Sequence, residues 1–341
     1  LIEQAEKRLD EFHVLKQRAL LLWDDSVLEK PESWYSEGLC SVASSKAKRL
    51  TRIKTGFYSP PKARICVPGF EWTSVVLTTL QSAPSLVCMR WWTTRGKYIS
   101  DRKSQFLQLF KHLSRTLTHR VIHVLDRWYA DTSILTRIIS ENQYFIVRWV
   151  KTYNLKDVHG LTQKTQLHAR SHKDQLVQVI WDAPRKQYRR VAISYQIVFL
   201  PKHPDHALTL VVCRDSKHKQ EPMYLLTNCP VVTKTQAWNI LFCYMRRWTI
   251  EQTFRFTKSE LAMESPRLWK WENRLKLLII IALIYDFILK FLRSWPTLAR
   301  KFINIWCPRT GKRQLETQLP LYRLRCAIAH LLNDFVAQNS G

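Results

Sequence analysis

The chain has 341 residues, of which 54 are Lys or Arg and 27 are Asp or Glu, so its formal net charge at pH 7 is +27. An excess of this size predicts a polyanionic partner, most commonly nucleic acid, with a ribosomal or membrane-surface protein as the competing explanation. Only 7 residues are glycine, and neither a GxxxxGK[ST] nor a GxGxxG motif occurs, which disfavours a nucleotide cofactor and ATP-driven chemistry.

The first 150 residues alternate between apolar runs and amphipathic segments. The expected elements are a helix at 2–17, strands at 19–23, 65–80 and 85–92, a helix at 101–117, a strand at 121–125, a helix at 132–140 and a strand at 144–150, with a polar, basic connection at 33–62. Three strands, a helix, a strand, a helix and a strand is the order of the ribonuclease H-like core. This order predicts an α/β fold, a mixed sheet flanked by helices.

Acidic residues follow two of the expected strands. Asp24 and Asp25 come directly after the run at 19–23, and Asp126 comes directly after the run at 121–125. The first and fourth strands are neighbours in a ribonuclease H-like sheet, so acids at these positions would lie together. Neighbouring residues of a strand point to opposite faces, and both Asp24 and Asp25 stay open at this point because the register is unknown.

Residues 151–232 have a different sequence pattern from the first 150 residues. Segments such as LVQVIW, RRVAISYQIVFL, ALTLVVC and MYLLTN predict antiparallel strands joined by polar turns. This stretch is interpreted as a β-rich insertion in the core. Trp181 lies in one of its strands, where packing is the usual role of a Trp and stacking on a flipped base is the alternative.

Four polar residues then follow one another at spacings of three, four and seven: Tyr244, Arg247, Glu251 and Lys258. On a single α-helix, at about 100° per residue, they would fall within roughly 60° of one another. Charged residues on such a stripe usually form a solvated face. Apolar and aromatic neighbours such as Trp248 instead predict a helix that is buried over much of its circumference, with a stripe suited to holding a metal ion against a phosphate backbone.

The rest of the chain is expected to be helical and basic. The longest apolar run, at 277–285, is too short to span a bilayer and predicts a buried helix. Residues 293–341 are interpreted as a basic, helical tail. The eight cysteines are scattered without a CxxC pair, which predicts reduced thiols and a cytoplasmic protein.

The spacing Tyr-x2-Arg-x3-Glu-x6-Lys resembles the signature of a large branch of bacterial insertion-sequence transposases, DDE enzymes related to the Tn-five transposase. The resemblance implies that Asp24, which aligns better than Asp25, forms a catalytic triad with Asp126 and Glu251. These acids would hold two Mg²⁺ ions, for which Mn²⁺ can substitute. The family often has Gly where this chain has Trp128, a departure that leaves the metal ligand intact.

The same resemblance implies the partners and the organisation. Tyr244 and Arg247 would contact the phosphate beside the scissile bond, and Lys258 the neighbouring backbone. The chain would act as a homodimer on transposon ends and target DNA in the bacterial cytoplasm, associated with the nucleoid, with no membrane partner. The expected division is 1–150 and 233–292 for the two parts of the catalytic core, 151–232 for the insertion and 293–341 for the tail.

The expected activity is metal-dependent DNA cleavage and strand transfer, as in cut-and-paste transposition. Two alternatives remain: a ribonuclease H-like nuclease without strand transfer, and a non-catalytic, DNA-binding transposon remnant. The acids and the four signature residues are all present, which argues against the remnant.

Overall fold

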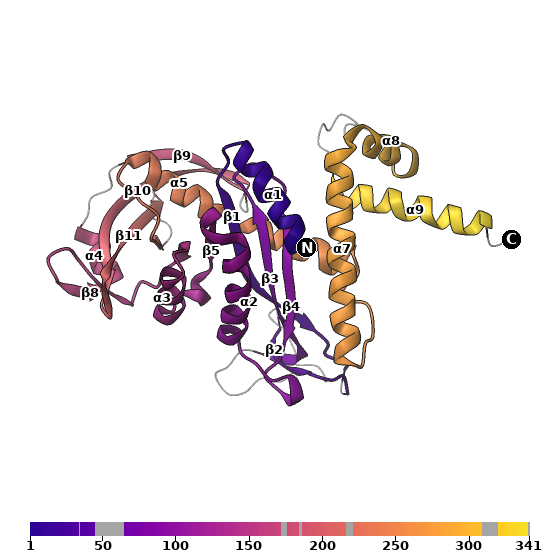
Figure 1. Cartoon of the computed structure of the whole chain (residues 1–341), viewed down its shortest axis with the longest axis horizontal. Helices are drawn as coiled ribbons and strands as arrows, with labels where there is room; N and C mark the ends of the chain where they lie inside the picture. The colour runs from indigo at the N-terminus through magenta and orange to yellow at the C-terminus, as the bar shows by residue number, and fades with distance from the viewer. Residues whose placement is uncertain are drawn as a thin grey trace.

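The structure is a computed structural model, and it describes residues 1–33, 35–44, 65–171, 176–183, 186–215, 221–308 and 320–339. Figure 1 shows one long, curved sheet with helices on both sides, and a helical C-terminal part beside it. Most of the expected connection at 33–62, and residues 309–319 of the expected tail, lie outside the described residues.

The described strands form one twelve-stranded sheet in the order β2-β3-β1-β5-β6-β12-β11-β10-β7-β8, with β4 paired to β3 and β9 to β10. Their bounds are β1 Ala19–Glu29, β2 Cys40–Ala43, β3 Cys66–Thr78, β4 Ser85–Trp92, β5 Val121–Leu125, β6 Tyr144–Arg148, β7 Asn154–Lys156, β8 Thr162–Lys164, β9 Leu176–Asp182, β10 Gln187–Leu200, β11 His203–Asp215 and β12 Met223–Thr227.

The centre of the sheet confirms the expected fold class. Strands β4, β3 and β1 form an antiparallel meander, and β5 and β6 follow in parallel with β1. This mixed sheet, in the order β4-β3-β1-β5-β6, is consistent with a ribonuclease H-like fold.

The strands of residues 151–232 extend this sheet. Strand β12 pairs antiparallel with β6 at the edge of the central strands, and β11, β10 and β9 continue outward. The chain between β6 and α5 therefore leaves the core and returns to it through β12, beside the parallel strand.

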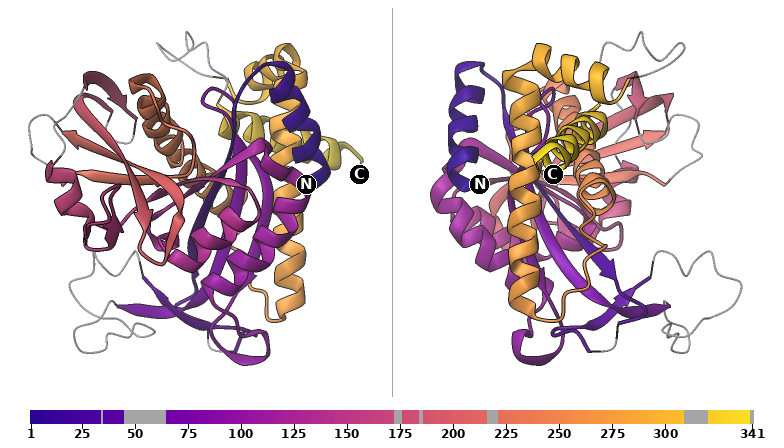
Figure 2. Two further views of the ribbon diagram at one scale, coloured as in Figure 1. Left: turned by 60° about the vertical axis from the view of Figure 1, so that its left-hand side comes forward. Right: turned by 90° about the vertical axis from the view of Figure 1, so that its right-hand side faces the viewer.

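Two helical layers cover the two faces of the central strands (Figures 1 and 2). The first layer buries its apolar side chains against Leu21 and Trp23, and the second buries its own against Leu20 and Leu22. The first layer contains α1 Ile2–Val14, α2 Arg102–Leu117 and α3 Thr132–Ser140; the second contains α5 Lys234–Met245, α6 Trp248–Arg255 and α7 Trp271–Ser294. Helices α8 Pro296–Trp306 and α9 Leu321–Asn339 pack against α7 beside the sheet (Figure 1). A short helix, α4 Thr165–Ser171, lies between β8 and β9. The alternation of inward and outward residues along β1 thus decides which helical layer each side chain meets.

Three expectations about elements are wrong. Strand β1 does not end before Asp24 but continues to Glu29, because β3 pairs with it as far as Glu29↔Gly69. The connection expected at 33–62 contains the strand β2, which adds to β3.

The third error concerns the apolar run at 277–285. It lies in α7, but only one side of that helix is buried. Within the run, the buried residues are Leu278, Ile281, Ala282 and Tyr285. The other side, including Ile279 and Leu283, is exposed. Among the described residues, no helix combines the length and the apolar character needed to cross a membrane.

Candidate active site

The register of two parallel strands places Asp24 beside Asp126. Leu20 pairs with Ile122 and Leu22 with Val124, so the same offset, continued by two residues, sets Asp24 level with Asp126. Asp126 is the first residue after β5 and precedes a 3-10 turn, Arg127–Tyr129. Because their parity is the same, both carboxyl groups face the layer that contains α5 and α6.

Asp25 points to the other face of the sheet and is occupied by protein groups. The hydroxyls of Tyr129, at 2.8 Å, and of Thr73 donate to its carboxylate. The guanidinium Nε of Arg102 lies 2.8 Å from its Oδ2. With its side chain only 6% exposed, Asp25 holds β1, β3, the turn after β5 and α2 together.

The surroundings of Asp24 disfavour its ionised form. Burial raises the pKa of Asp24 to about 7, the nearby Arg247 lowers it, and the Asp126 and Asp25 carboxylates raise it further. A site that raises a carboxyl pKa in this way favours either a proton or a metal cation.

The prediction that Tyr244, Arg247, Glu251 and Lys258 lie on a single α-helix is wrong, because the segment is interrupted. Helix α5 ends at Met245, α6 begins at Trp248, and a π-helical turn, Phe256–Glu260, follows α6. Arg246 explains the first break, since its guanidinium donates to the carbonyls of Thr79, at 2.9 Å, and Ser82 at the end of β3. These bonds tie the junction to the sheet.

The interrupted segment still directs three of the four side chains to the acids. The Tyr244 hydroxyl donates to Asp126 Oδ1 at 3.2 Å. Arg247 donates to Asp24 Oδ2 and to Glu251 Oε1, both at 2.9 Å. Arg247 therefore lies between two of the expected metal ligands and neutralises part of their charge. Burial lowers the pKa of Arg247, but the nearby Asp24, followed by Tyr244 and the other two acids, outweighs this effect and raises it.

Lys258 is attached to β1 further along that strand. Its Nζ donates to Ser26 Oγ at 2.8 Å and to the Val27 carbonyl at 2.6 Å, and lies over the Trp72 ring. These contacts fasten the π-helical turn to the part of β1 beyond Asp24. The expected contact of Lys258 with DNA stays a prediction.

The acids fit a divalent cation in kind. Asp24 and Asp126 offer hard oxygen donors, and they repel one another in a partly buried setting. Glu251, with its side chain 46% exposed, lies on the far side of Arg247. Within the described ranges, no three His, Cys, Asp or Glu side chains are grouped closely enough to hold a metal ion. The metal role of the three acids stays a prediction.

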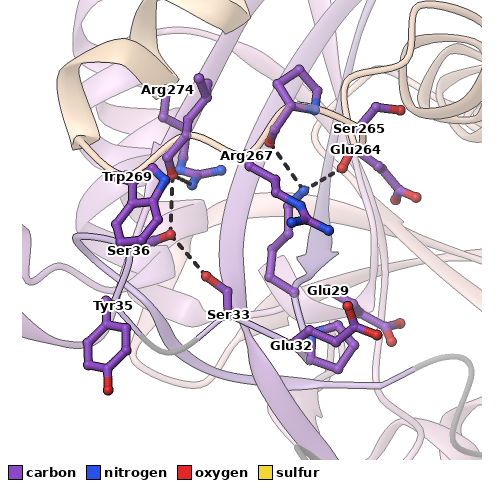
Figure 3. A pocket seen from close by; sticks show the side chains of 14 residues that line it. Glu29, Glu32, Ser33, Tyr35, Ser36, Glu264, Ser265, Arg267, Trp269 and Arg274 are labelled. Carbon is purple, nitrogen blue, oxygen red and sulfur yellow. Dashed lines mark hydrogen bonds between the residues drawn. The ribbon is translucent and has the colours of Figure 1, made fainter.

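Two other features lie apart from the acids. Trp181 belongs to β9, where its half-exposed ring makes an edge contact with Tyr188, so its role in base binding also stays a prediction. A cavity of about 490 Å³ lies between the residues that follow β1 and the loop before α7 (Figure 3). Its lining contains none of Asp24, Asp126 and Glu251.

Sequence reasoning missed three residues of this centre: Arg102, Tyr129 and Arg246. Tyr129 was visible in the run Asp126-Arg-Trp-Tyr, but its partner Asp25 is 104 positions away in the chain. Arg246 stands directly before Arg247, and its partners, the carbonyls of Thr79 and Ser82, are more than 160 positions away in the chain. No local pattern distinguishes a cation that ends a helix from one that faces a ligand.

Comparisons with known proteins identify the family of the chain and a similar fold. The family model described as "Transposase DDE domain" matches residues 98–287, more than half of the chain, including Asp126 and Glu251. In the cryo-EM structure of a piggyBac transposase synaptic complex with hairpin DNA, the similar part covers 94% of this chain and 53% of that chain, with a TM-score of 0.50 and 11% sequence identity. The chain thus spans about half the length of that transposase, and the likeness concerns the fold. No curated protein matches the sequence. On the family match, the chain belongs to the transposase DDE domain family.

Proposed function

We propose that this chain is the catalytic part of a DNA transposase that cleaves DNA at the ends of an insertion sequence and joins the freed 3′ hydroxyl to target DNA. The observation that carries the proposal is the pair of carboxyl groups, Asp24 and Asp126, level with one another on adjacent strands, with Arg247 between Asp24 and Glu251. The family match and the net charge of +27 support DNA as the substrate.

The three acids are the proposed metal ligands. Asp24, Asp126 and Glu251 would hold divalent cations, Mg²⁺ or Mn²⁺. When bound, two such ions stabilise the negative charge that develops on the attacking and leaving oxygens of a phosphodiester.

Arg247 has donors that fit a phosphate as well as they fit carboxylates. With Asp24 and Glu251 engaged as metal ligands, Arg247 would direct its donors to the phosphate beside the scissile bond. Tyr244, now bound to Asp126, would orient the same group. The remaining parts of the proposal are a homodimer on paired transposon ends and a bacterial cytoplasmic, nucleoid-associated location.

A strand-transfer assay tests the proposal. The chain is incubated with labelled DNA of the element ends, Mg²⁺ and a supercoiled target plasmid. Joined product is the expected result, and Asp24→Asn, Asp126→Asn and Glu251→Gln should each abolish it. Glu272→Gln is the matched control, because Glu272 also lies in the first turn of a helix and pairs at i+4, with Lys276, on the surface.

The alternatives give different products. Cleavage without joining would assign a nuclease, and binding without either reaction would assign a non-catalytic remnant. Full activity of Glu251→Gln would show that the proposed site is wrong.

A further inference from the structure

Trp128 is an exposed aromatic residue two positions after a candidate catalytic acid. It lies in the 3-10 turn Arg127–Tyr129, and 65% of its surface is exposed. The turn itself is fixed, because the Tyr129 N–H donates to the Asp126 carbonyl at 3.0 Å and the Tyr129 hydroxyl donates to Asp25. A large apolar ring is therefore held in solvent on a fixed turn, two residues after Asp126 in the chain.

The protein supports this ring from one side. The guanidinium carbon of Arg102 lies 4.8 Å from the centroid of the Trp128 ring, at cation–π distance. Arg102 is in turn anchored by its ion pair with Asp25. The chain of contacts from β1 through Arg102 restrains the indole before any ligand arrives, which lowers the entropic cost of stacking on it.

The surroundings suit a nucleic-acid strand. Arg127, the residue before Trp128 in the same turn, is exposed, and Lys103 follows Arg102 on α2. Consecutive Cα atoms are about 3.8 Å apart, so the Cα atoms of Asp126 and Trp128 are at most about 7.6 Å apart. That reach corresponds to about two nucleotide steps along a DNA strand at roughly 3.4 Å each.

We propose that Trp128 is a stacking platform for an unpaired nucleobase of the DNA strand that passes the acids, with Arg102 as its support. The platform rests on the proposed function, because it requires DNA at this edge of the sheet. An exposed indole offers any base a π-face without reading its sequence, so the ligand class is single-stranded or locally unpaired DNA. The competing role for Trp128 is a hydrophobic cover over the ion pair of Arg102 with Asp25.

Binding measurements separate these roles without any cleavage. The probes are a fluorescein-labelled deoxythymidine 12-mer and an abasic 12-mer of the same charge, titrated with the whole chain at fixed salt. Trp128→Ala should weaken binding of the thymidine probe by roughly 5- to 150-fold, the range expected for loss of one base–aromatic stack. It should leave binding of the abasic probe unchanged. Trp128→Phe should retain most of the affinity, and Trp128→Leu should behave like the Ala variant.

Trp269 is a matched control, because it is also 65% exposed but lies at the cavity before α7. Trp269→Ala should bind both probes as the parent chain does. If Trp128→Leu binds the thymidine probe as tightly as the parent, or if the abasic probe loses as much affinity, the ring is only a cover and the platform is wrong. If the parent chain binds neither probe, both the platform and the proposed function are wrong. If it binds the probes but joins no DNA in the strand-transfer assay, only the proposed function is wrong.

Discussion

Asp24 and Asp25 are neighbours in the chain with opposite environments. Asp25 is bonded to two hydroxyls and lies against Arg102, whereas Asp24 faces Asp126 and shares Arg247 with Glu251. Alternation along β1 produces this difference, since one residue faces α2 and the other faces the α5–α6 junction. The same pair of acids thus contains one structural and one candidate catalytic group.

Removal of the structural acid should be the more destabilising change. In Asp25→Ala the buried hydroxyls of Tyr129 and Thr73 lose their acceptor and Arg102 loses its counter-ion, so we expect the free energy of unfolding to fall by about 3 kcal/mol. In Asp24→Ala, Arg247 keeps Glu251, and the carboxylate that is removed is one that burial already disfavours at pH 7, so the loss should stay below about 1 kcal/mol. Urea unfolding at pH 7 measures both. Equal losses would contradict the assignment of the two roles.

The raised pKa of Asp24 predicts a pH-dependent stability. Asp has a pKa of about 3.9 in an unfolded chain, whereas burial, opposed by Arg247 and reinforced by Asp126 and Asp25, raises that of Asp24 to about 7. A carboxyl group with the higher pKa in the folded state stabilises the fold below about pH 4, and this contribution is lost as the pH rises towards 7. Asp24→Asn should therefore gain stability relative to the parent, by up to about 4 kcal/mol between pH 4 and pH 8.

Comparing the parent with Asp24→Asn cancels the contribution of His123, whose titration changes the stability with pH in the opposite direction. Burial lowers the pKa of His123 to about 4, which makes both proteins more stable as the pH rises from 4 to about 6.5. Thermal unfolding of both proteins, with and without Mg²⁺, is the measurement. Mg²⁺ should stabilise the parent more at pH 8 than at pH 6, because the cation competes with a proton, and should have no such effect on Asp24→Asn. A constant difference between the two proteins across this range would contradict the shifted pKa.

At the scale of elements, the break between α5 and α6 positions the catalytic candidates. Across the junction at Arg246, Tyr244 at the end of α5 reaches Asp126, while Arg247, just before α6, reaches Asp24. Helix α5 begins with a capping box at Thr233 and Gln236, a signal readable from sequence, but it ends because of a tertiary contact.

Arg246→Ala should disturb the site without removing any residue of it. The carbonyls of Thr79 and Ser82 would lose the charged guanidinium donor and keep only the Thr78 hydroxyl, which costs about 1–3 kcal/mol, and Arg247 would lose its fixed position. We expect strand-transfer activity to fall at least tenfold, while affinity for duplex DNA changes less than threefold. Arg255→Ala, at the exposed end of α6, is the control for removal of a cation from this segment. Parent-like joining by Arg246→Ala would show that the junction does not position Arg247.

At the scale of the molecule, local patterns predicted the elements better than their junctions. Strands β4 and β5 and helix α3 have the predicted bounds, because alternation and amphipathic periodicity are properties of a short window. The continuation of β1 beyond Asp24 depends on its pairing with β3, and the choice of Asp24 depends on register with β5. These are contacts between segments far apart in sequence, which no single window contains.

The candidate acids lie at the carboxyl end of β5, which predicts that DNA binds at that end. An ionic-strength experiment can test this prediction. Arg120 and Arg127 are both exposed and flank β5, but Arg120 lies at its amino end beside Asp10, and Arg127 lies at its carboxyl end beside Asp126. If duplex DNA runs along the carboxyl end of β5, Arg127→Gln should release about one phosphate contact. The slope of log K against log salt should then become shallower by about 0.9. Arg120→Gln should leave the slope unchanged. Fluorescence anisotropy with a random-sequence duplex between about 50 and 200 mM salt measures the slopes, and an effect of Arg120→Gln equal to that of Arg127→Gln would place the DNA elsewhere on this basic surface.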